Sequence, residues 1–147
     1  MAFADGTADT LIQVGQSISV TLESIVGRHG LTLAQWRVLD CLQDGSGKTM
    51  SSLSSACGIR LSALSRLVDR MVVRSLVMRK RDENDQRVII VMASDFGLEY
   101  YARSAAAVDA FDAWLAERIC DFELDNLNVL AIGSEDLRSN PLYMGLE

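Results

Sequence analysis

The sequence is poor in the residues from which metal sites, disulfide frameworks and helix breaks are made. Its one proline, Pro141, lies near the C-terminal end of 147 residues, so no proline upstream prevents long helices. The three cysteines, Cys41, Cys57 and Cys120, are widely spaced without a CxxC pair, and the single histidine, His29, offers them one partner. These counts exclude a zinc site with four protein ligands and argue against a disulfide framework. We therefore expect buried, reduced thiols, no metal and no cofactor.

The sequence also has no apolar run of eighteen residues, and its first six residues lack the basic and apolar regions of a signal peptide. We expect no contact with a membrane and a cytoplasmic location. It has no glycine-rich phosphate loop and no nucleophile–base pair at a readable spacing, so we predict that the protein is not an enzyme. The apolar content of 49% is ample for one ordinary core.

Charge is distributed unevenly along the chain. The formal net charge is −6, yet eight of the fourteen Lys and Arg residues fall between Arg60 and Arg87, beside only four acidic residues. That window carries +4, and the other residues, with six basic and sixteen acidic side chains, carry −10. This segregation predicts one basic face that binds phosphate and acidic flanks that repel it.

Apolar residues at three- and four-residue steps predict two helices before residue 45. The first spans about 9–26, and its stripe consists of Leu11, Val14, Ile18, Leu22 and Ile25. Glycines at 27 and 30 end it. Thr32 is a good N-cap for the second helix, and Gln35, three residues later, completes a capping box. The buried face of the second helix is predicted to be Trp36, Leu39 and Leu42.

Two further helices, joined by a turn at Gly58, form a helix-turn-helix candidate. Thr49 or Ser51 opens the first, and the second runs from about Arg60 to Ser75. The apolar stripe of the second is Leu61, Leu64, Val68 and Met71, and its polar side is Ser62, Ser65, Arg66, Asp69 and Arg70. Small hydroxyls let a helix sit deep in a major groove, where arginines reach guanine edges or phosphates. Taken alone, this face suits a solvated charge cluster equally well.

A β-hairpin is predicted directly after this helix. Residues 76–81 and 88–92 are β-branched and apolar enough to form strands, and they flank a charged tip at 82–87. A hairpin in this position is a wing, whose tip can insert an arginine into the adjacent minor groove. Asp85 and Arg87 project on the same side, so we expect the Asp85 carboxylate to hold the Arg87 guanidinium in one rotamer.

Ser94 is a good N-cap for a very long helix, and a further helix is predicted over about 121–132. The stripe of the long helix consists of Leu98, Tyr101, Ala105, Val108, Phe111, Leu115 and Ile119. Together with the first helix, it has more apolar surface than a small winged domain can cover. We therefore expect a homodimer with interleaved termini, in preference to a helical pair within one chain.

The segment from Leu31 to Tyr100 resembles the MarR family of winged helix-turn-helix regulators. The matching stretches are LTLAQWRVL at 31–39, SRLVDRM at 65–71, RDENDQR at 81–87 and SDFG at 94–97. The resemblance implies an obligate homodimer, often a repressor, that places one recognition helix in each of two successive major grooves of a pseudo-palindromic operator. It also implies a small effector, frequently a phenolic or aromatic acid, that binds between the dimerisation and DNA-binding regions.

The expected fold is mainly α with a small β-hairpin wing, in a single domain over 1–147. Within it we expect a winged helix-turn-helix over 31–93 and dimerisation helices at 9–27 and 94–147. The expected function is that of a sequence-specific repressor released by a small aromatic or phenolic ligand. Two alternatives stay open, namely a regulator of the same fold that senses oxidants through cysteine, and a helical protein–protein adaptor that does not bind DNA.

The expected DNA contacts fall into two groups. Contacts to phosphate are assigned to Thr49, Ser51, Arg60, Arg74, Arg79, Lys80 and Arg81, and wing-tip contacts to Asp85 and Arg87. Base readout is assigned to Ser62, Ser65, Arg66 and Arg70. The candidate effector contacts are His29, Trp36, Arg37, Tyr100 and Tyr101, since an arginine pairs with a carboxylate and aromatic rings stack on an aromatic acid.

Overall fold

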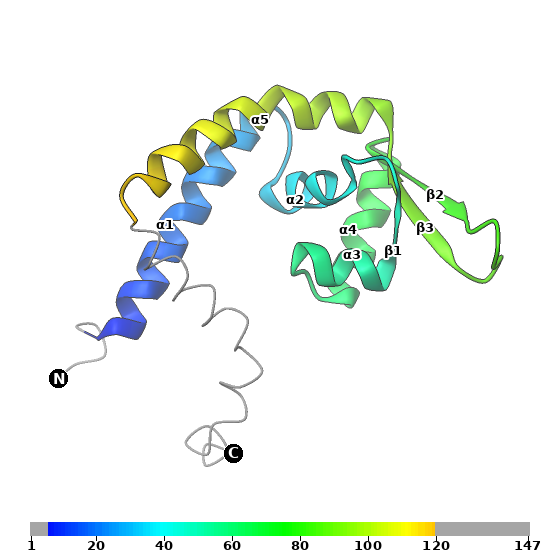
Figure 1. Ribbon diagram of the computed structural model, residues 1–147, viewed down its shortest axis with the longest axis horizontal. Helices are drawn as coiled ribbons and strands as arrows, with labels where there is room; N and C mark the ends of the chain where they lie inside the picture. Colours follow the sequence, from blue (N-terminus) through cyan, green and yellow to red (C-terminus); the bar gives the residue numbers. More distant parts are fainter. Residues whose placement is uncertain (1–5, 120–147) are drawn as a thin grey trace, which may run out of the picture. The chain divides into compact units, whose positions relative to one another are not determined.

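The computed structural model describes residues 6–119, in which five helices and three short strands follow one another (Figure 1). The helices are α1 (Thr7–Gly27), α2 (Leu33–Leu42), α3 (Met50–Cys57), α4 (Leu61–Val73) and α5 (Asp95–Ala116). The strands are β1 (Lys48–Thr49), β2 (Val77–Arg81) and β3 (Ile89–Ala93). The predicted fold class, mainly α with a small β-hairpin wing, is confirmed.

The helix starts follow the predicted capping residues. The Thr32 side chain accepts a hydrogen bond from the Gln35 backbone N–H, and the Gln35 side chain accepts one from the Thr32 N–H, which completes the capping box of α2. Thr49 caps α3 through the Ser52 N–H at 3.1 Å. Ser94 Oγ accepts from the Gly97 N–H at 2.9 Å, as expected for the first turn of α5.

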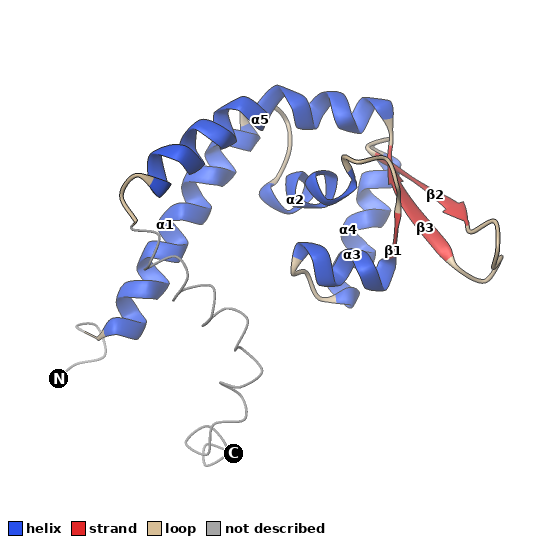
Figure 2. Ribbon diagram, in the orientation of Figure 1, coloured by secondary structure: helices blue, strands red, loops and turns tan. Residues whose placement is uncertain are grey.

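The three strands form one antiparallel sheet in the order β1-β3-β2 (Figure 2). The hairpin pairs Val77 with Ala93 at its base and Arg81 with Ile89 at its tip. Strand β1, which the sequence analysis missed, adds Thr49 beside Ile90 on the other edge of β3. Two residues are too short a run to show the alternation by which strands are recognised in a sequence.

One core lies beneath the helix-turn-helix and the base of the wing. Its fully buried residues include Leu39 and Leu42 of α2, Leu53 of α3 and Val91 of β3. The buried face of α4 is Leu64, Leu67, Val68 and Met71. The predicted stripe was therefore wrong at Leu61, which is 50% exposed because it opens the helix before the first turn that faces the core.

The first compact unit of the chain is Met1–Val108 and the second is Asp109–Glu147, with the boundary inside α5. The expectation of one domain stays a prediction. In the second unit, Phe111 and Trp114 stack with ring centroids 5.8 Å apart. The stripe predicted through Ile119 was too long by one turn, since α5 ends at Ala116. The helix predicted over 121–132 lies outside the described residues.

No helix within residues 6–119 is both long enough and apolar enough to cross a membrane.

Two glycines within helices allow a matched test of packing. A methyl group on Gly97 would lie 2.0 Å from the Leu76 carbonyl oxygen, whereas a methyl group on Gly15 of α1 would meet nothing within 4 Å. We expect Gly97→Ala to lower the free energy of unfolding by at least about 2 kcal/mol, because backbone must move. Gly15→Ala should raise it by about 0.5–1 kcal/mol through helix propensity. Urea unfolding of both variants measures the difference, and equal effects would contradict the close approach.

Candidate nucleic-acid interface

Helices α3 and α4 form the predicted helix-turn-helix, with Gly58 in the left-handed conformation at the turn. The Ser54 hydroxyl donates to the Ile59 carbonyl at 2.6 Å and ties the turn to α3. Because the apolar side of α4 faces the core, its polar side is turned outward. The residues exposed there are Ser62, Ser65, Arg66, Asp69 and Arg70, as the sequence predicted.

Three arginines at this surface are available to a ligand. Arg60, at the N-cap position of α4, makes no capping hydrogen bond with its side chain. Within residues 6–119, neither Arg60 nor Arg66 nor Arg70 has a side-chain ion pair or hydrogen bond to another residue. All three are exposed. Exposed guanidinium groups of this kind can bind phosphates and guanine edges.

Arg79 connects the wing to α4, the candidate reading helix for the major groove. Its guanidinium lies 2.7 Å from the Asp69 carboxylate on the polar side of α4. Strand residues alternate between the faces of a sheet, so Arg81 shares the face of Arg79 while Lys80 lies on the opposite one. The three cations predicted together as phosphate contacts at 79–81 are thus divided between two faces of the hairpin.

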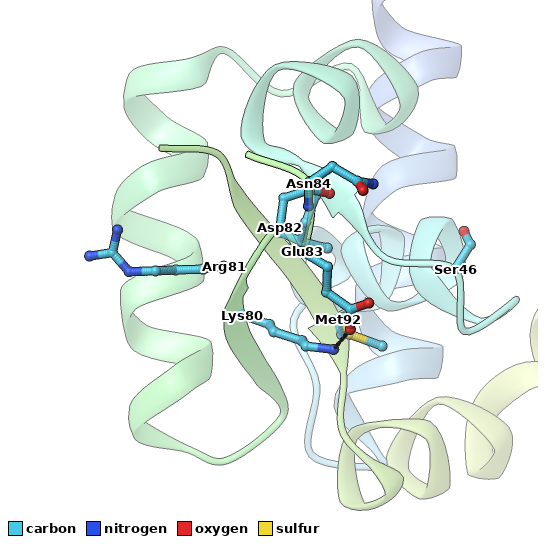
Figure 3. Close-up of a pocket in the computed structure, with 8 residues that line it drawn as sticks. Ser46, Lys80, Arg81, Asp82, Glu83, Asn84 and Met92 are labelled. Carbon is cyan, nitrogen blue, oxygen red and sulfur yellow. Dashed lines mark hydrogen bonds and ion pairs between the residues drawn. The ribbon is translucent and has the colours of Figure 1, made fainter. Parts of the chain in front are cut away.

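The opposite face carries a hollow of about 250 Å³ between the wing and Ser46 (Figure 3). Lys80 and Glu83 form an ion pair there at 2.8 Å, and Arg81 points away from the hollow. The hydrogen bond from Lys80, and then its charge, lowers the pKa of the Glu83 carboxyl. The same contact raises the pKa of Lys80. Lys80 is therefore already paired with the Glu83 carboxylate in the free protein.

The wing tip is built by its carboxylates. Asp82 Oδ1 accepts from the backbone N–H groups of Asn84 and Asp85, at 2.8 and 2.9 Å. Asp85 Oδ1 accepts from the backbone N–H of Arg87 at 3.0 Å. The expected contact between the Asp85 carboxylate and the Arg87 guanidinium was wrong, because a short aspartate side chain reaches the N–H two residues on. Arg87 is exposed at the end of this turn.

Arg74, at the C-cap of α4, turns back toward the protein. Its guanidinium donates to Gln35 Oε1 at 2.9 Å and to the Gly30 carbonyl at 2.8 Å. The assignment of Arg74 to phosphate conflicts with this geometry, since the fork of the side chain is already occupied. Thr49 is likewise engaged as the cap of α3, and Ser51 is exposed in the first turn after it.

The candidate effector residues divide into three places. Trp36 and Tyr101 stack with centroids 5.2 Å apart, and the Tyr101 hydroxyl donates to Asp40 at 2.7 Å. Trp36 Nε1 is buried without a hydrogen-bond partner among residues 6–119. Arg37 reaches the turn at Gly58 instead, where its Nη2 would lie 3.4 Å from a methyl group on that glycine.

Tyr100 belongs to a second aromatic group that the sequence analysis missed. Phe96 lies against Tyr100 at 4.8 Å, and the Arg103 guanidinium lies 4.6 Å from the centre of the Tyr100 ring. A methyl group on Gly30 would touch this ring, so Tyr100 packs against the connection that contains the half-buried His29. The spacing of 96, 100 and 103 on one helix was the available signal.

Of the cysteines described by the structure, Cys57 is buried and Cys41 is half-buried. Cys57 is 1% exposed. Burial, reinforced by Cys57 and Asp40, raises the pKa of the Cys41 thiol. Residues 6–119 hold no group of three or more His, Cys, Asp or Glu side chains that could bind a metal.

Residues 31–89 match the sequence model of the MarR family. The chain is 27% identical over 105 residues to the homoprotocatechuate degradative operon repressor of Escherichia coli, a match that covers 71% of each protein.

Solved structures share the fold. AbsC, a MarR family transcriptional regulator from Streptomyces coelicolor, superposes with a TM-score of 0.79 at 26% identity, over 95% of this chain and 98% of AbsC. CouR from Rhodococcus jostii RHA1 bound to p-coumaroyl-CoA superposes with a TM-score of 0.78 at 23% identity, over 90% of this chain and 94% of CouR. The transcriptional repressor CouR bound to a 23-mer DNA duplex superposes with a TM-score of 0.73 at 23% identity, over 88% of this chain and 92% of CouR.

Burial of the thiols predicts slow chemistry with electrophiles. In a Cys120→Ser variant at neutral pH, we expect Cys41 and Cys57 to react with iodoacetamide far more slowly than in urea. Burial shields Cys57 from the reagent, and the raised pKa of Cys41 lowers the fraction of its nucleophilic thiolate. Mass spectrometry of timed samples measures the rates. The rate for Cys41 should increase with pH, and the increase should occur at higher pH than in the unfolded protein, since the pKa of Cys41 is raised. Equal rates in the folded and unfolded protein would favour a thiol that is built to sense oxidants.

Proposed function

We propose that this chain is a member of the MarR family of winged helix-turn-helix proteins and a sequence-specific DNA-binding transcriptional regulator, as the match of residues 31–89 and the shared fold of AbsC support. We further propose that it is a repressor released by a small aromatic or phenolic ligand. The observation that supports the proposal most is the open polar side of α4, which carries unpaired arginines and is joined to the wing by the Asp69–Arg79 ion pair.

The groove-reading part of the proposal rests on side-chain size and exposure. Ser62 and Ser65 lie in the first turns of α4, where small side chains permit close approach to base edges. Arg66 and Arg70 follow one turn later, with guanidinium groups free to form the paired hydrogen bonds that guanine accepts. Arg87 at the wing tip is placed to enter the minor groove beside that site.

Phosphate contacts are assigned to cations and N–H groups around this face. Arg60 precedes α4 and has no internal partner among the described residues. The N-terminus of α3, at Thr49 and Ser51, presents backbone N–H groups of the kind that bind phosphate. Arg81 shares the α4 side of the hairpin, although its guanidinium also donates to the Gln86 carbonyl at 2.7 Å.

We propose that the second copy of the chain covers α1. Among the described residues of this helix only Val26 is buried, although the helix has 21 residues. Large apolar side chains that remain exposed on it are Leu11, Ile12, Val14 and Val20. An apolar surface of this length is unusual on a monomer and typical of a symmetric interface. Two copies would place two reading helices on a pseudo-palindromic operator.

The effector part of the proposal draws on the relatives and on the aromatic groups near α2 and α5. One relative represses an operon for homoprotocatechuate degradation, and a structural neighbour binds p-coumaroyl-CoA. In this chain, the buried Trp36 Nε1 offers an unused donor beside Tyr101. Arg103 over the Tyr100 ring supplies the cation that Arg37, at the Gly58 turn, does not. A planar ring with a carboxylate suits these groups.

The DNA assignment predicts distinct losses for two arginines. With the DNA upstream of the protein's own coding region, affinity should fall steeply as salt rises. Arg87→Ala should weaken binding without changing the thermal unfolding midpoint, because the side chain has no internal role. Arg66→Ala should reduce discrimination between bases by about 1–3 kcal/mol. Fluorescence anisotropy over a salt series measures both effects.

Arg103→Ala is the matched control, since this exposed arginine of α5 lies outside the basic window and should leave the salt dependence unchanged. Absence of binding to any sequence at low salt would favour the protein–protein adaptor.

The effector assignment predicts release of DNA by an aromatic acid. Within a panel of hydroxylated benzoates, phenylacetates and cinnamates, at least one should lower operator affinity, and aliphatic acids of equal charge should not. In a Trp114→Phe variant, whose remaining tryptophan is Trp36, the same acid should quench tryptophan fluorescence. Release without quenching would place the effector elsewhere. If no acid in the panel causes either release or quenching, an aromatic ligand is contradicted.

A further inference from the structure

We propose that Arg74 is a positioning residue for DNA binding, which holds the C-terminal end of the reading helix α4 against the connection between α1 and α2. The inference rests on the proposed function, because it concerns how the reading helix is aimed. It assigns to Arg74 an internal role in place of a phosphate contact.

The geometry of the side chain carries the first step. Arg74 Nη1 donates to Gln35 Oε1 at 2.9 Å, and Nη2 donates to the Gly30 carbonyl at 2.8 Å. Two separate nitrogens thus reach two acceptors on one short segment of chain. A guanidinium is planar with fixed donor directions, so this double contact specifies the orientation of α4 at its last turn.

The acceptors are themselves held in place. Gln35 is 6% exposed, and its Oε1 also accepts from the Thr32 N–H at 3.1 Å, so one oxygen caps α2 and binds Arg74. Gly30 has a φ of +82° and packs against the Tyr100 ring. Glu23 of α1 accepts from the Leu33 N–H at 2.9 Å. The fork therefore joins α4 to a segment that α1, α2 and α5 already fix.

The position along α4 argues against a direct contact with DNA. Ser62, the proposed groove residue, precedes Arg74 by twelve residues, which is about 18 Å along a helix axis. When a helix tilts about its C-terminal end, its N-terminal end moves by the tilt angle multiplied by this length. An anchor at Arg74 thus controls the fit of Ser62 and Arg66 in the groove without touching the groove itself.

Substitution by lysine separates positioning from phosphate binding. Arg74→Lys retains the positive charge, so a phosphate contact would survive it, whereas one ammonium cannot reproduce the two directed contacts. We expect Arg74→Lys to weaken operator binding about tenfold, which is an ordinary size for the energetic coupling between two sites. The slope of log affinity against log salt concentration should be unchanged. Arg74→Gln should weaken binding to a similar extent, also without a change in slope.

Two further measurements keep the assignment distinct from general destabilisation. Gln35→Met removes the shared acceptor, and combined with Arg74→Lys it should lose little more than either change alone. Arg118→Lys, the same exchange at an exposed arginine that donates to the Trp114 carbonyl outside the basic window, should leave operator affinity unchanged. Thermal unfolding of each variant is followed in parallel, and affinity is compared at a temperature where all are folded.

The outcomes are separable. If wild-type protein binds operator DNA and Arg74→Lys binds equally well, the positioning role is wrong and the proposed function stands. A salt slope shallower by about 0.9 for each lost contact in Arg74→Gln would make Arg74 a phosphate ligand and overturn the inference. If the wild-type protein binds no DNA, the proposed function fails and the inference fails with it.

Discussion

The close approach of α5 to the chain after α4 is the constraint on which the arrangement of reading helix and wing depends. The Leu76 carbonyl accepts from the backbone N–H of Ser94 at 3.0 Å, and Ser94 Oγ donates to the Ser75 carbonyl at 2.5 Å. Gly97 lies so near Leu76 that no side chain fits. The residue that closes the wing and begins α5 is thereby fixed to the end of α4. Reading helix, hairpin and α5 consequently share one junction.

The basic window contains two kinds of cation that sequence alone does not distinguish. Arg79 and Lys80 are paired with carboxylates, and Arg74 is bonded to the α1–α2 connection. Arg66 and Arg70 face outward without such partners among the described residues. The charge of +4 over 60–87 is therefore the sum of cations that hold the interface together and cations that remain available to a polyanion. Only the second kind should contribute to the release of counterions from DNA.

Local signals account for most of what the sequence predicted correctly. The capping box at Thr32, the cap at Ser94 and the hairpin around 82–87 each depend on neighbours within a few residues. Most of the failures concern partners distant in the chain, and the expected contact between the Asp85 and Arg87 side chains is a local exception. The contact of Arg74 with Gly30 spans 44 residues and that of Arg79 with Asp69 joins a strand to a helix, so no spacing rule predicts either. Arg37 was grouped with Trp36 because a cation and an aromatic ring at the entry of α2 suit an aromatic carboxylate, although neighbours on a helix point about 100° apart.

The position of Gly30 suggests how an effector would reach the reading helix under the proposed function. A methyl group on this residue would lie 3.2 Å from the Tyr100 ring, and its carbonyl accepts from Arg74. A ligand that displaces the Tyr100 ring therefore removes the support of the acceptor that orients α4. Such a ligand shifts the equilibrium only by its difference in affinity between the two arrangements. The hydrogen bond from Arg74 to the Gly30 carbonyl contributes to the free-energy gap that such a ligand must overcome, because a directed hydrogen bond weakens as its acceptor moves.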